Sequence, residues 1–430
     1  MDLTVEGKLF VNGSFENACI GVKDGKIESV KKILKSSDHI NFKNKLILPA
    51  GIDMHVHFRD PGFTYKEDFS SGSKAALFGG VSCVFDMPNT SPQSVNVPTL
   101  IDKIKSFKNK SFVDFGIYAG LTDNNIDDVE RLSDYSNGFK IYLGSSTNSL
   151  LLSKKNIRSA LKKASESDKI VLFHAEDEEC LRKHKSVENG LVDHIKNRPS
   201  VCEEEAIKNI LNASKDLKIQ LHICHVSSIE GFEILKNRAA NVSFGITPHH
   251  SLLDVDNIRG ASGFFKVNPP IRSSFDREAL FNSLKNGFCD VIESDHAPHT
   301  MDEKNNSFND IPSGVPGVET LYPLFLYLAK KNYISFQRVV SLICKRPSEL
   351  LGIRKGCLKE GFDADFIVVD LKDEKRVKSS DLHSKCGWSP FEDFNALFPS
   401  DVFVRGTHMV EESSLIGSKR QGRFVSDLYE

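Results

Sequence analysis

The sequence predicts an α/β protein, a (β/α)8 TIM-type barrel with a small β-sandwich domain formed from both termini. Eight short apolar runs alternate with helical stretches through the middle of the chain, as in a barrel of parallel strands. The two ends contain short strand-like runs and little amphipathic helix. We therefore expect the first part of the sandwich in residues 1–49, the barrel in 50–355 and the second part of the sandwich in 356–430.

The N-terminal segment has the pattern of strands joined by tight turns. Its run "KLFVNGSFENACIGVKDGKIESV" contains Asn12-Gly13 and Asp24-Gly25. Such pairs favour two-residue hairpin turns, because Asn, Asp and Gly tolerate a positive φ. The C-terminal runs "ADFIVVDL" and "DVFVRGTHMV" have a similar composition. Both ends are therefore expected to contribute strands to one small domain.

The predicted barrel strands lie in eight runs: "LILPAGIDMHVH", "VSCVFDMPN", "VDFGIYAGL", "GFKIYLG", "IVLFHAE", "IQLHICHVS", "VSFGITPHH" and "CDVIESDHAPH". Stretches such as "YKEDFSSGSKAALFGG" and "PSVCEEEAIKNILNASKD" between them have helical character. In the second stretch, Ser200 and Glu203 predict a capping box, and the acidic run "CEEEA" predicts a solvated helix face.

Composition excludes several classes of protein. The 430 residues include 56 Lys and Arg against 58 Asp and Glu, which argues against a nucleic-acid or membrane surface driven by net charge. The nine cysteines form no even framework and no CxxC pair, so reduced thiols are expected. The chain begins without the pattern of a signal peptide and has no apolar stretch of bilayer length. We expect a cytoplasmic enzyme that acts on a small molecule.

Most of the predicted strands finish in polar residues of the kind that chemistry uses. In a barrel of this type the carboxyl ends of all strands meet at the face that carries the active site. We expect His55, His57 and Asp295 to hold one divalent metal ion there, and His174 and His225 to hold a second. The polar strand ends are His55 and His57, Asp86 and Asn89, Lys140, His174, His225, His249 and His250, and Asp295.

Lys140 stands in the fourth run, where an anion between two metal ions would be expected. An ammonium group cannot bind a cation, but a lysine that has reacted with carbon dioxide becomes a carbamate with two oxygens. A lysine that reaches a surface carboxylate is the simpler interpretation, and the residues alone favour it.

Nine motifs together resemble those of the cyclic amidohydrolases, and within them the type I dihydroorotases: "DMHVHFRDPG", "DMPNT", "FKIYLG", "FHAE", "HICHVS", "TPHH", "KVNPPIR", "SDHAPHT" and "GVPGVET". The resemblance runs in order from about residue 46 to 355, and the β-rich ends fit the split sandwich of that family. It implies that Lys140 is the carboxylated lysine that bridges two metal ions, most commonly Zn2+. Animal members also show a cysteine and a glutamate near a third metal. Cys224 is present, but Gly245 stands at the place of the glutamate, so a third ion is not expected.

The same resemblance implies the reaction. Type I dihydroorotases reversibly close N-carbamoyl-L-aspartate to (S)-dihydroorotate plus water, in the de novo biosynthesis of UMP. A hydroxide that bridges the metals would attack the ring amide, with Asp295 as general acid and base. A homo-oligomer or an association with aspartate transcarbamoylase are the partners to be considered.

Arg59 lies two residues past His57, on the same face if the strand stays extended. A guanidinium beside metal ions suits an anionic substrate, which it would bind through bidentate pairing. An ion pair between Arg59 and Asp60 is the structural alternative. The expected substrate-binding residues are His57, Arg59, Asn89, Asn268, His299, Ser313 and Gly314.

Two other functions remain open. An allantoinase or a hydantoinase (dihydropyrimidinase) would use the same metals on another cyclic amide, but Arg59 and Asn89 favour a carboxylated ring. A catalytically inactive scaffold would lack metal ligands, whereas this sequence has all six.

Overall fold

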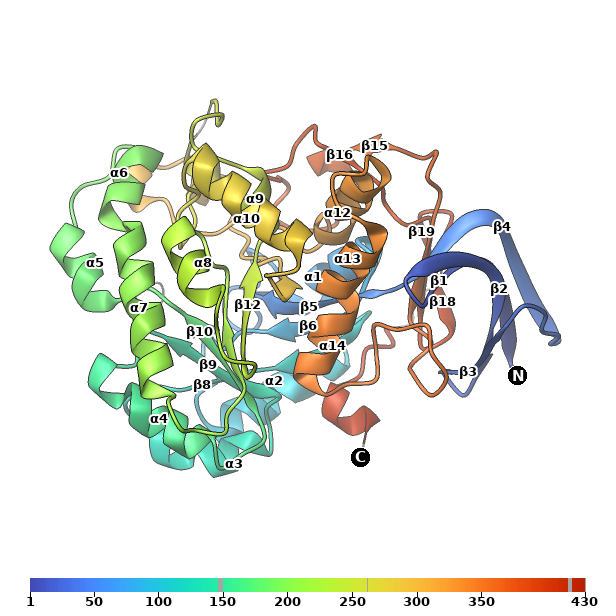
Figure 1. The fold of residues 1–430 in the computed structure, drawn as a ribbon, viewed down its shortest axis with the longest axis horizontal. Helices are drawn as coiled ribbons and strands as arrows, with labels where there is room; N and C mark the ends of the chain where they lie inside the picture. The colour runs from blue at the N-terminus through green and yellow to red at the C-terminus, as the bar shows by residue number, and fades with distance from the viewer. Residues whose placement is uncertain (146–149, 261, 417–419, 430) are drawn as a thin grey trace.

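The apolar runs in the middle of the chain form parallel strands that helices surround, as Figure 1 shows. The computed structural model describes residues 1–145, 150–260, 262–416 and 420–429. Strands β5, β6 and β7 form one sheet, and strands β8 to β13 form a second in which neighbours in sequence are neighbours in space. A parallel bridge between Val56 and His296 connects β5 to the residues that follow β13 and so closes the ring. The predicted barrel is confirmed.

Each of the eight predicted runs contains a barrel strand, and the third run is divided in two at Tyr118. The strands are β5 (Gly51–Val56), β6 (Val81–Asp86), β7 (Asp114–Ile117), β8 (Ala119–Gly120), β9 (Gly138–Tyr142), β10 (Ile170–His174), β11 (Leu221–Ile223), β12 (Val242–Ile246) and β13 (Val291–Ile292).

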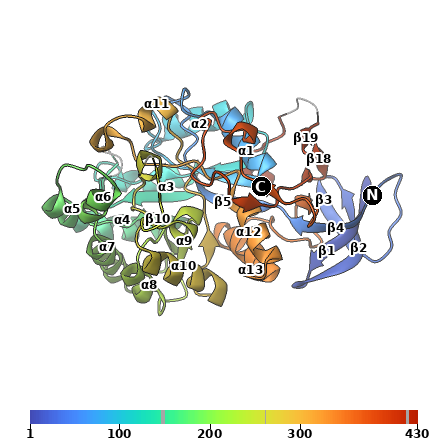
Figure 2. The same cartoon turned by 90° about the horizontal axis from the view of Figure 1, so that it is seen from above.

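Helices follow the barrel strands and cover their outer side (Figure 2). They are α1 (Phe69–Phe78), α2 (Val97–Lys108), α3 (Val129–Ser133), α4 (Ile157–Ala164), α5 (Glu178–His184), α6 (Leu191–Asn197), α7 (Ser200–Ala213), α8 (Ile229–Leu235), α9 (Pro248–Leu252), α10 (Ser274–Asn286), α11 (Met301–Lys304), α12 (Leu321–Lys330), α13 (Phe336–Val340) and α14 (Arg346–Leu351).

Alternation along the strands gives the barrel an inner and an outer core. Phe139 and Ile141 of β9 belong to the large cluster that also includes residues of α4 and α7. Lys140 lies between them and therefore faces the other side, opposite Leu172 in the β9–β10 register. Leu172 belongs to a separate apolar cluster with Ile52, Met54, Cys83, Phe85 and Ile170. This inner cluster fills the barrel below the polar strand ends.

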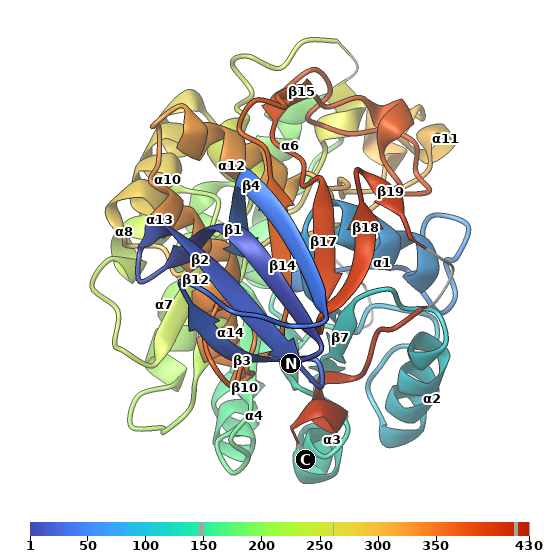
Figure 3. The ribbon, with the colours of Figure 1, turned by 90° about the vertical axis from the view of Figure 1, so that its right-hand side faces the viewer.

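Both termini contribute to one eight-stranded sheet, which faces the viewer in Figure 3. The two parts meet where β14 pairs antiparallel with β4, with Ile367 opposite Leu48. The Asn12-Gly13 and Asp24-Gly25 turns both have positive φ at each residue, as a two-residue hairpin requires. The strands are β1 (Leu3–Val11), β2 (Ser14–Lys23), β3 (Lys26–Lys31), β4 (Asp38–Pro49), β14 (Phe366–Val369), β17 (Asp401–Val404), β18 (Thr407–Glu411) and β19 (Ser414–Leu415).

The last segment before β17 leaves this sheet and lies against the barrel. The short pair β15 (Lys375–Arg376) and β16 (Asn395–Ala396) flanks it, and Leu397 donates to the carbonyl of Pro323 in α12. Part of the predicted second sandwich segment thus packs on the barrel. The domain boundaries 1–49, 50–355 and 356–430 stay a prediction.

The expected capping box at α7 is wrong. Pro199 precedes the helix as its N-cap and no side chain caps it. Glu203 is buried and instead accepts hydrogen bonds from the backbone and hydroxyl groups of Ser227 and Ser228, before α8. The solvated face predicted for the acidic run therefore does not include Glu203, because its carboxylate satisfies the start of the neighbouring helix.

The expectation that all cysteines are reduced thiols is also wrong. Cys180 of α5 and Cys202 of α7 form a disulfide, while seven other cysteines are free. The spacing of 22 residues gave no sign of it, because the two helices are brought together by packing. Among the described residues, no helix combines the length and apolarity needed to cross a bilayer.

Candidate metal centre and substrate pocket

The predicted metal ligands lie at the carboxyl ends of five barrel strands. His55 is in β5 with His57 just after it, Lys140 is in β9, and His174 ends β10. His225 and Asp295 follow β11 and β13, and both have a positive φ, of 40° and 45°. These six side chains are nearly or fully buried. They lie at the face where barrels of this type carry their active sites.

One group of donors consists of His55, His57 and Asp295. The Nε2 atoms of His55 and His57 lie 3.3 Å and 3.0 Å from Oδ1 of Asp295. The Nδ1 atom of His57 lies 2.6 Å from Oδ1 of Asn89, which fixes the orientation of the ring. Nitrogen and carboxylate donors that lie within 4.8 Å of one another fit a divalent ion such as Zn2+.

A second group lies next to the first. The rings of His55 and His225 are 5.2 Å apart, and Nδ1 of His174 lies 3.2 Å from Nε2 of His225. The other nitrogen of His174 lies 2.7 Å from Glu176, which also pairs with Arg198. A carboxylate behind an imidazole is the usual way to orient a metal ligand. Two facing imidazole nitrogens therefore complete a second donor pair.

Lys140 is buried beside these donors without a counter-charge. Its Nζ atom donates to Sγ of Cys224 at 3.1 Å. Among the described residues, no carboxylate lies within 4 Å of that amine, so the surface ion pair considered as its simpler interpretation does not form. An isolated buried ammonium is costly, whereas a carbamate would be compensated by metal ions. The surroundings fit carboxylation.

Charge is distributed unevenly across the donors. Burial alone would raise the pKa of Asp295, but His55 and His57 hold it well below its usual range. Burial and the nearby Lys140 lower the pKa of His55 to about 4. The carboxylate is therefore ionised and the imidazole neutral at pH 7, the states in which both bind a metal.

Arg59 lies near Asp295 of the donor group, although β5 ends before it. Its φ of 60° turns the chain out of the extended conformation assumed in the sequence-based argument. The guanidinium donates to the carbonyl of Pro298 at 3.2 Å and lies 3.1 Å from Nε2 of His299. Asp60 pairs with Lys110 instead, and no described carboxylate lies within 4 Å of Arg59. This half-buried cation is free to pair with an anion.

Two loops carry the remaining predicted substrate contacts. Asn268 has a buried Oδ1 atom without a hydrogen-bond partner. The carbonyl of Ser313 lies 3.1 Å from Nε2 of His299. Gly314 has a φ of 142°, and a Cβ there would meet the carbonyl of Ala297 at 2.4 Å, so only glycine fits. Its amide donates to the carbonyl of Lys266, which joins the two loops.

The sequence reasoning missed Glu293. It lies two residues before Asp295 in a strand run, and alternation could have placed both on one face. Its side chain occupies the space beside Gly245, where a Cβ would meet Oε1 at 2.4 Å. His55, Cys224 and Glu293 form a further group of possible donors within 4.8 Å of one another. Gly245 itself offers no donor, as expected, but Glu293 from the neighbouring strand places a carboxylate beside it.

Other histidines differ in role. His222 lies between Ser243 and Glu293. His250 contacts Thr247 and the carbonyl of Pro269, while Nε2 of His249 has no hydrogen-bond partner. His194 is buried between Glu188 and the carbonyl of Val267.

The chain from residue 46 to 408 matches the model of the amidohydrolase family. The chain belongs to the amidohydrolase family.

Several amidohydrolase relatives are similar over almost the whole chain. A dihydroorotase of Thermoplasma volcanium is 39% identical over 430 residues, covering 100% of this chain and 99% of the relative. A dihydroorotase of Methanosarcina acetivorans is 35% identical, covering 97% and 94%. Among solved structures, an L-hydantoinase (dihydropyrimidinase) from Arthrobacter aurescens has a TM-score of 0.94 at 26% identity, covering 99% of both chains.

Proposed function

We propose that this amidohydrolase is a dihydroorotase, which reversibly closes N-carbamoyl-L-aspartate to (S)-dihydroorotate and water. The observation that carries the proposal is the unpaired guanidinium of Arg59 beside the cluster of metal donors. The carboxylate that dihydroorotate keeps outside the reacting amide would pair with it. The full-length similarity to dihydroorotases supports the same reaction.

We further propose two divalent ions per chain, Zn2+ by the chemistry of the donors, and a carbamate on Lys140 formed from carbon dioxide. When bound, the ions would polarise the amide carbonyl and lower the pKa of water to supply the nucleophile. His55, His57 and Asp295 would hold one ion, His174 and His225 the other, and the carbamate of Lys140 would lie between them.

Asp295 would act as the general acid and base. Its Oδ1 atom contacts His55 and His57, whereas Oδ2 has no hydrogen-bond partner among the described residues. In the hydrolytic direction Oδ2 would accept the proton of the attacking water and pass it to the ring nitrogen that leaves. Arg59 and His299 would hold the carboxylate meanwhile, and Asn89, Asn268, Ser313 and Gly314 would surround the ring.

The similarity to an L-hydantoinase makes a hydantoinase or dihydropyrimidinase the second candidate. The ring of a hydantoinase or dihydropyrimidinase substrate lacks the carboxylate, so Arg59 would have no partner in that complex. Rates on dihydroorotate, allantoin and dihydrouracil, measured side by side, separate these functions. A preference for dihydrouracil would contradict the proposal.

Lys140→Ala tests the proposed bridge. Without the carbamate the two donor groups lose their shared anion, so metal content and activity should both fall, and short carboxylic acids should restore part of the activity. Metal analysis of the purified protein and assays with added acetate or propionate measure this. Lys103→Ala is a matched control, since Lys103 is equally buried but pairs with Asp86. Two tightly bound ions and full activity in Lys140→Ala would rule out the bridge.

We also propose that this enzyme acts in the cytoplasm. We further propose that it forms a homo-oligomer or associates with aspartate transcarbamoylase. Size measurement of the purified chain, alone and mixed with that transcarbamoylase, tests the partners.

A further inference from the structure

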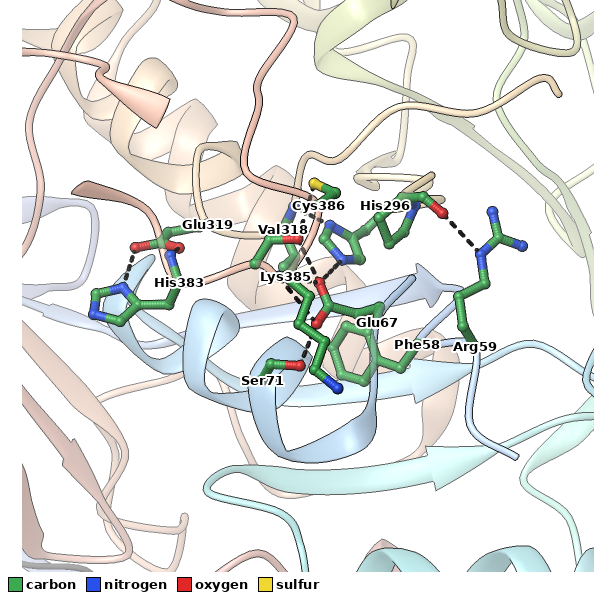
Figure 4. Close-up of polar contacts among 12 residues, drawn as sticks. Phe58, Arg59, Glu67, Ser71, His296, Val318, Glu319, His383, Lys385 and Cys386 are labelled. Atoms are coloured by element: carbon green, nitrogen blue, oxygen red, sulfur yellow. Dashed lines mark hydrogen bonds and ion pairs between the residues drawn. The ribbon is translucent and has the colours of Figure 1, made fainter. Parts of the chain in front are cut away.

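Residues 383–388, which we name the clamp segment, lie across the loops that carry the substrate pocket. The segment belongs to the C-terminal part of the chain, between β15 and β16, and not to the barrel strands. Figure 4 shows Lys385 and Cys386 of this segment beside Glu67 and His296 of the barrel loops. No part of the proposed chemistry requires these contacts.

The first contact reaches the pocket directly. Nε1 of Trp388 donates to the carbonyl of His299 at 2.8 Å. The indole is buried, with 6% of its surface exposed, and lies against Phe264 and the amine of Lys304. The ring of His299 in turn contacts Arg59. One hydrogen bond therefore separates the clamp segment from the residues that would bind the carboxylate.

The second contact passes through Glu67, a fully buried carboxylate before α1. Its oxygens accept hydrogen bonds from the hydroxyl of Ser384, the amide of Lys385 at 3.3 Å and the hydroxyl of Ser71. Oε2 also lies 3.4 Å from Nε2 of His296 (Figure 4). Glu67 thus ties the clamp segment to the residue next to Asp295.

His296 extends this connection to the loop of Gly314. Its Nδ1 atom accepts from the amides of Gly317 and Val318, at 3.1 Å and 3.3 Å, so the proton of a neutral ring is on Nε2 and faces Glu67. Next to Val318, Glu319 accepts from the backbone and the ring of His383, which begins the clamp segment. The segment is therefore attached to both loops that border the pocket.

We propose that the clamp segment is a specificity element, in which Trp388 is a positioning residue that fixes His299, and through it Arg59, for the carboxylate of the substrate. This inference rests on the proposed function. A carboxylate pocket needs its donors held in one geometry before the ligand arrives, since each side chain ordered on binding weakens affinity. Trp388 holds the backbone of His299 from outside the barrel and does not touch substrate.

Trp388→Phe removes the indole N–H and keeps an aromatic ring. Because a neutral buried hydrogen bond is worth about a three- to tenfold change in an equilibrium constant, KM for dihydroorotate should rise about three- to tenfold. The kcat should stay within about twofold, since the metal donors are not disturbed, and metal content should not change. A purely structural role would lower stability and leave this split between KM and kcat absent.

Tyr322→Phe is the matched control. Tyr322 is a buried aromatic residue whose hydroxyl donates to the carbonyl of Pro49 at 3.2 Å, at the end of β4 and before β5 begins. It should lose stability without a change in KM. An unchanged KM in Trp388→Phe, or an equal rise in both variants, would overturn the proposal. If the unaltered protein does not turn over dihydroorotate at all, the proposed function fails instead.

A second readout is tryptophan fluorescence, which needs no substitution at Trp388. Trp388 is the only tryptophan of the chain, so its fluorescence reports on the clamp segment alone. Titration of the metal-loaded protein with succinate, a dicarboxylate that cannot react, should shift the emission and saturate, and Arg59→Met should abolish the shift. An emission that stays constant up to succinate concentrations that inhibit the enzyme, or that shifts equally in Arg59→Met, would overturn the proposal.

Discussion

At Arg59 the backbone leaves the extended conformation, and the guanidinium reaches Pro298 and His299 instead of a carboxylate. Burial lowers the pKa of Arg59 from its ordinary value, although the group stays charged at pH 7. The same pocket holds His299, whose pKa burial and Arg59 lower to about 3. Arg59 therefore keeps its positive charge next to the neutral imidazole of His299.

Arg59→Met should decide which ring is accepted. A charge-assisted contact to the carboxylate and the cost of leaving it unpaired together predict a fall of about 10²- to 10⁴-fold in kcat/KM for dihydroorotate. Metal content should not change, and the gap between dihydroorotate and dihydrouracil should narrow. Rate constants on both rings measure this, with Arg158→Met, an exposed arginine on α4, as the control. An equal loss on both rings would assign Arg59 a structural role.

Lys304 predicts a pH dependence of stability. Burial and Lys266 lower its pKa to about 7, whereas an unfolded lysine titrates at about 10.4. Between these values the unfolded chain binds one more proton, so the free energy of unfolding should rise with pH across this window. The stability gained through deprotonation of Lys304 in the unfolded chain at high pH is lost as the pH falls towards 7.

Lys304→Met should remove this rise. Denaturant unfolding at pH 7 and pH 9 should show a gain in the unaltered protein that exceeds the gain in the variant by about 1–3 kcal/mol. Lys110→Met, which removes a lysine paired with Asp60, serves as control and should keep the rise. If the free energy of unfolding rose equally with pH in all three proteins, Lys304 would not have the lowered pKa.

At the scale of elements, α7 and α8 are joined by Glu203. Burial raises the pKa of this carboxyl, and the amide and hydroxyl groups of Ser227 and Ser228 satisfy it with five hydrogen bonds. The serines follow His225, so this contact also fixes the turn that carries a proposed metal donor. The start of α8 thus depends on a side chain from another helix.

Glu203→Ala should lower the free energy of unfolding by about 2–4 kcal/mol, because buried donors lose their acceptor. Glu204→Ala is its control on the same helix. Glu204 only pairs with Lys208 one turn away, and its loss should cost less than about 1 kcal/mol. Urea unfolding of both variants compares them, and similar values would show that Glu203 is not needed by α8.

For the whole molecule, the proposed reaction sets a relation between pH and the amounts of the two compounds. Carbamoyl-aspartate has one more carboxylate than dihydroorotate, so ring closure consumes a proton. Closure should be favoured about tenfold per unit as pH falls, above the carboxylate pKa values of about 4. The ratio of the compounds, measured after long incubation from both directions, tests this. A ratio independent of pH would mean that the reaction is a different one.

The sequence by itself determined the barrel and the polar residues at the ends of its strands. Strand runs are short, apolar and regularly spaced, and their polar ends must meet because parallel strands share one carboxyl edge. That is why His55, His57, His174, His225 and Asp295 could be proposed as metal donors without a structure, whereas Lys140 was proposed only through the resemblance to the cyclic amidohydrolases. Their motifs are local in sequence, and local patterns are what a single chain displays.

Tertiary structure alone decided the contacts between distant segments. The disulfide of Cys180 with Cys202, the use of Glu203 by α8 and the place of Glu293 beside Gly245 all depend on how elements pack. The clamp segment is the strongest case, since Trp388 and His299 are 89 residues apart. The pattern of apolar and polar residues along the chain does not predict such a contact. A hydrogen bond between two loops depends on where both backbones lie, and neither local sequence determines that.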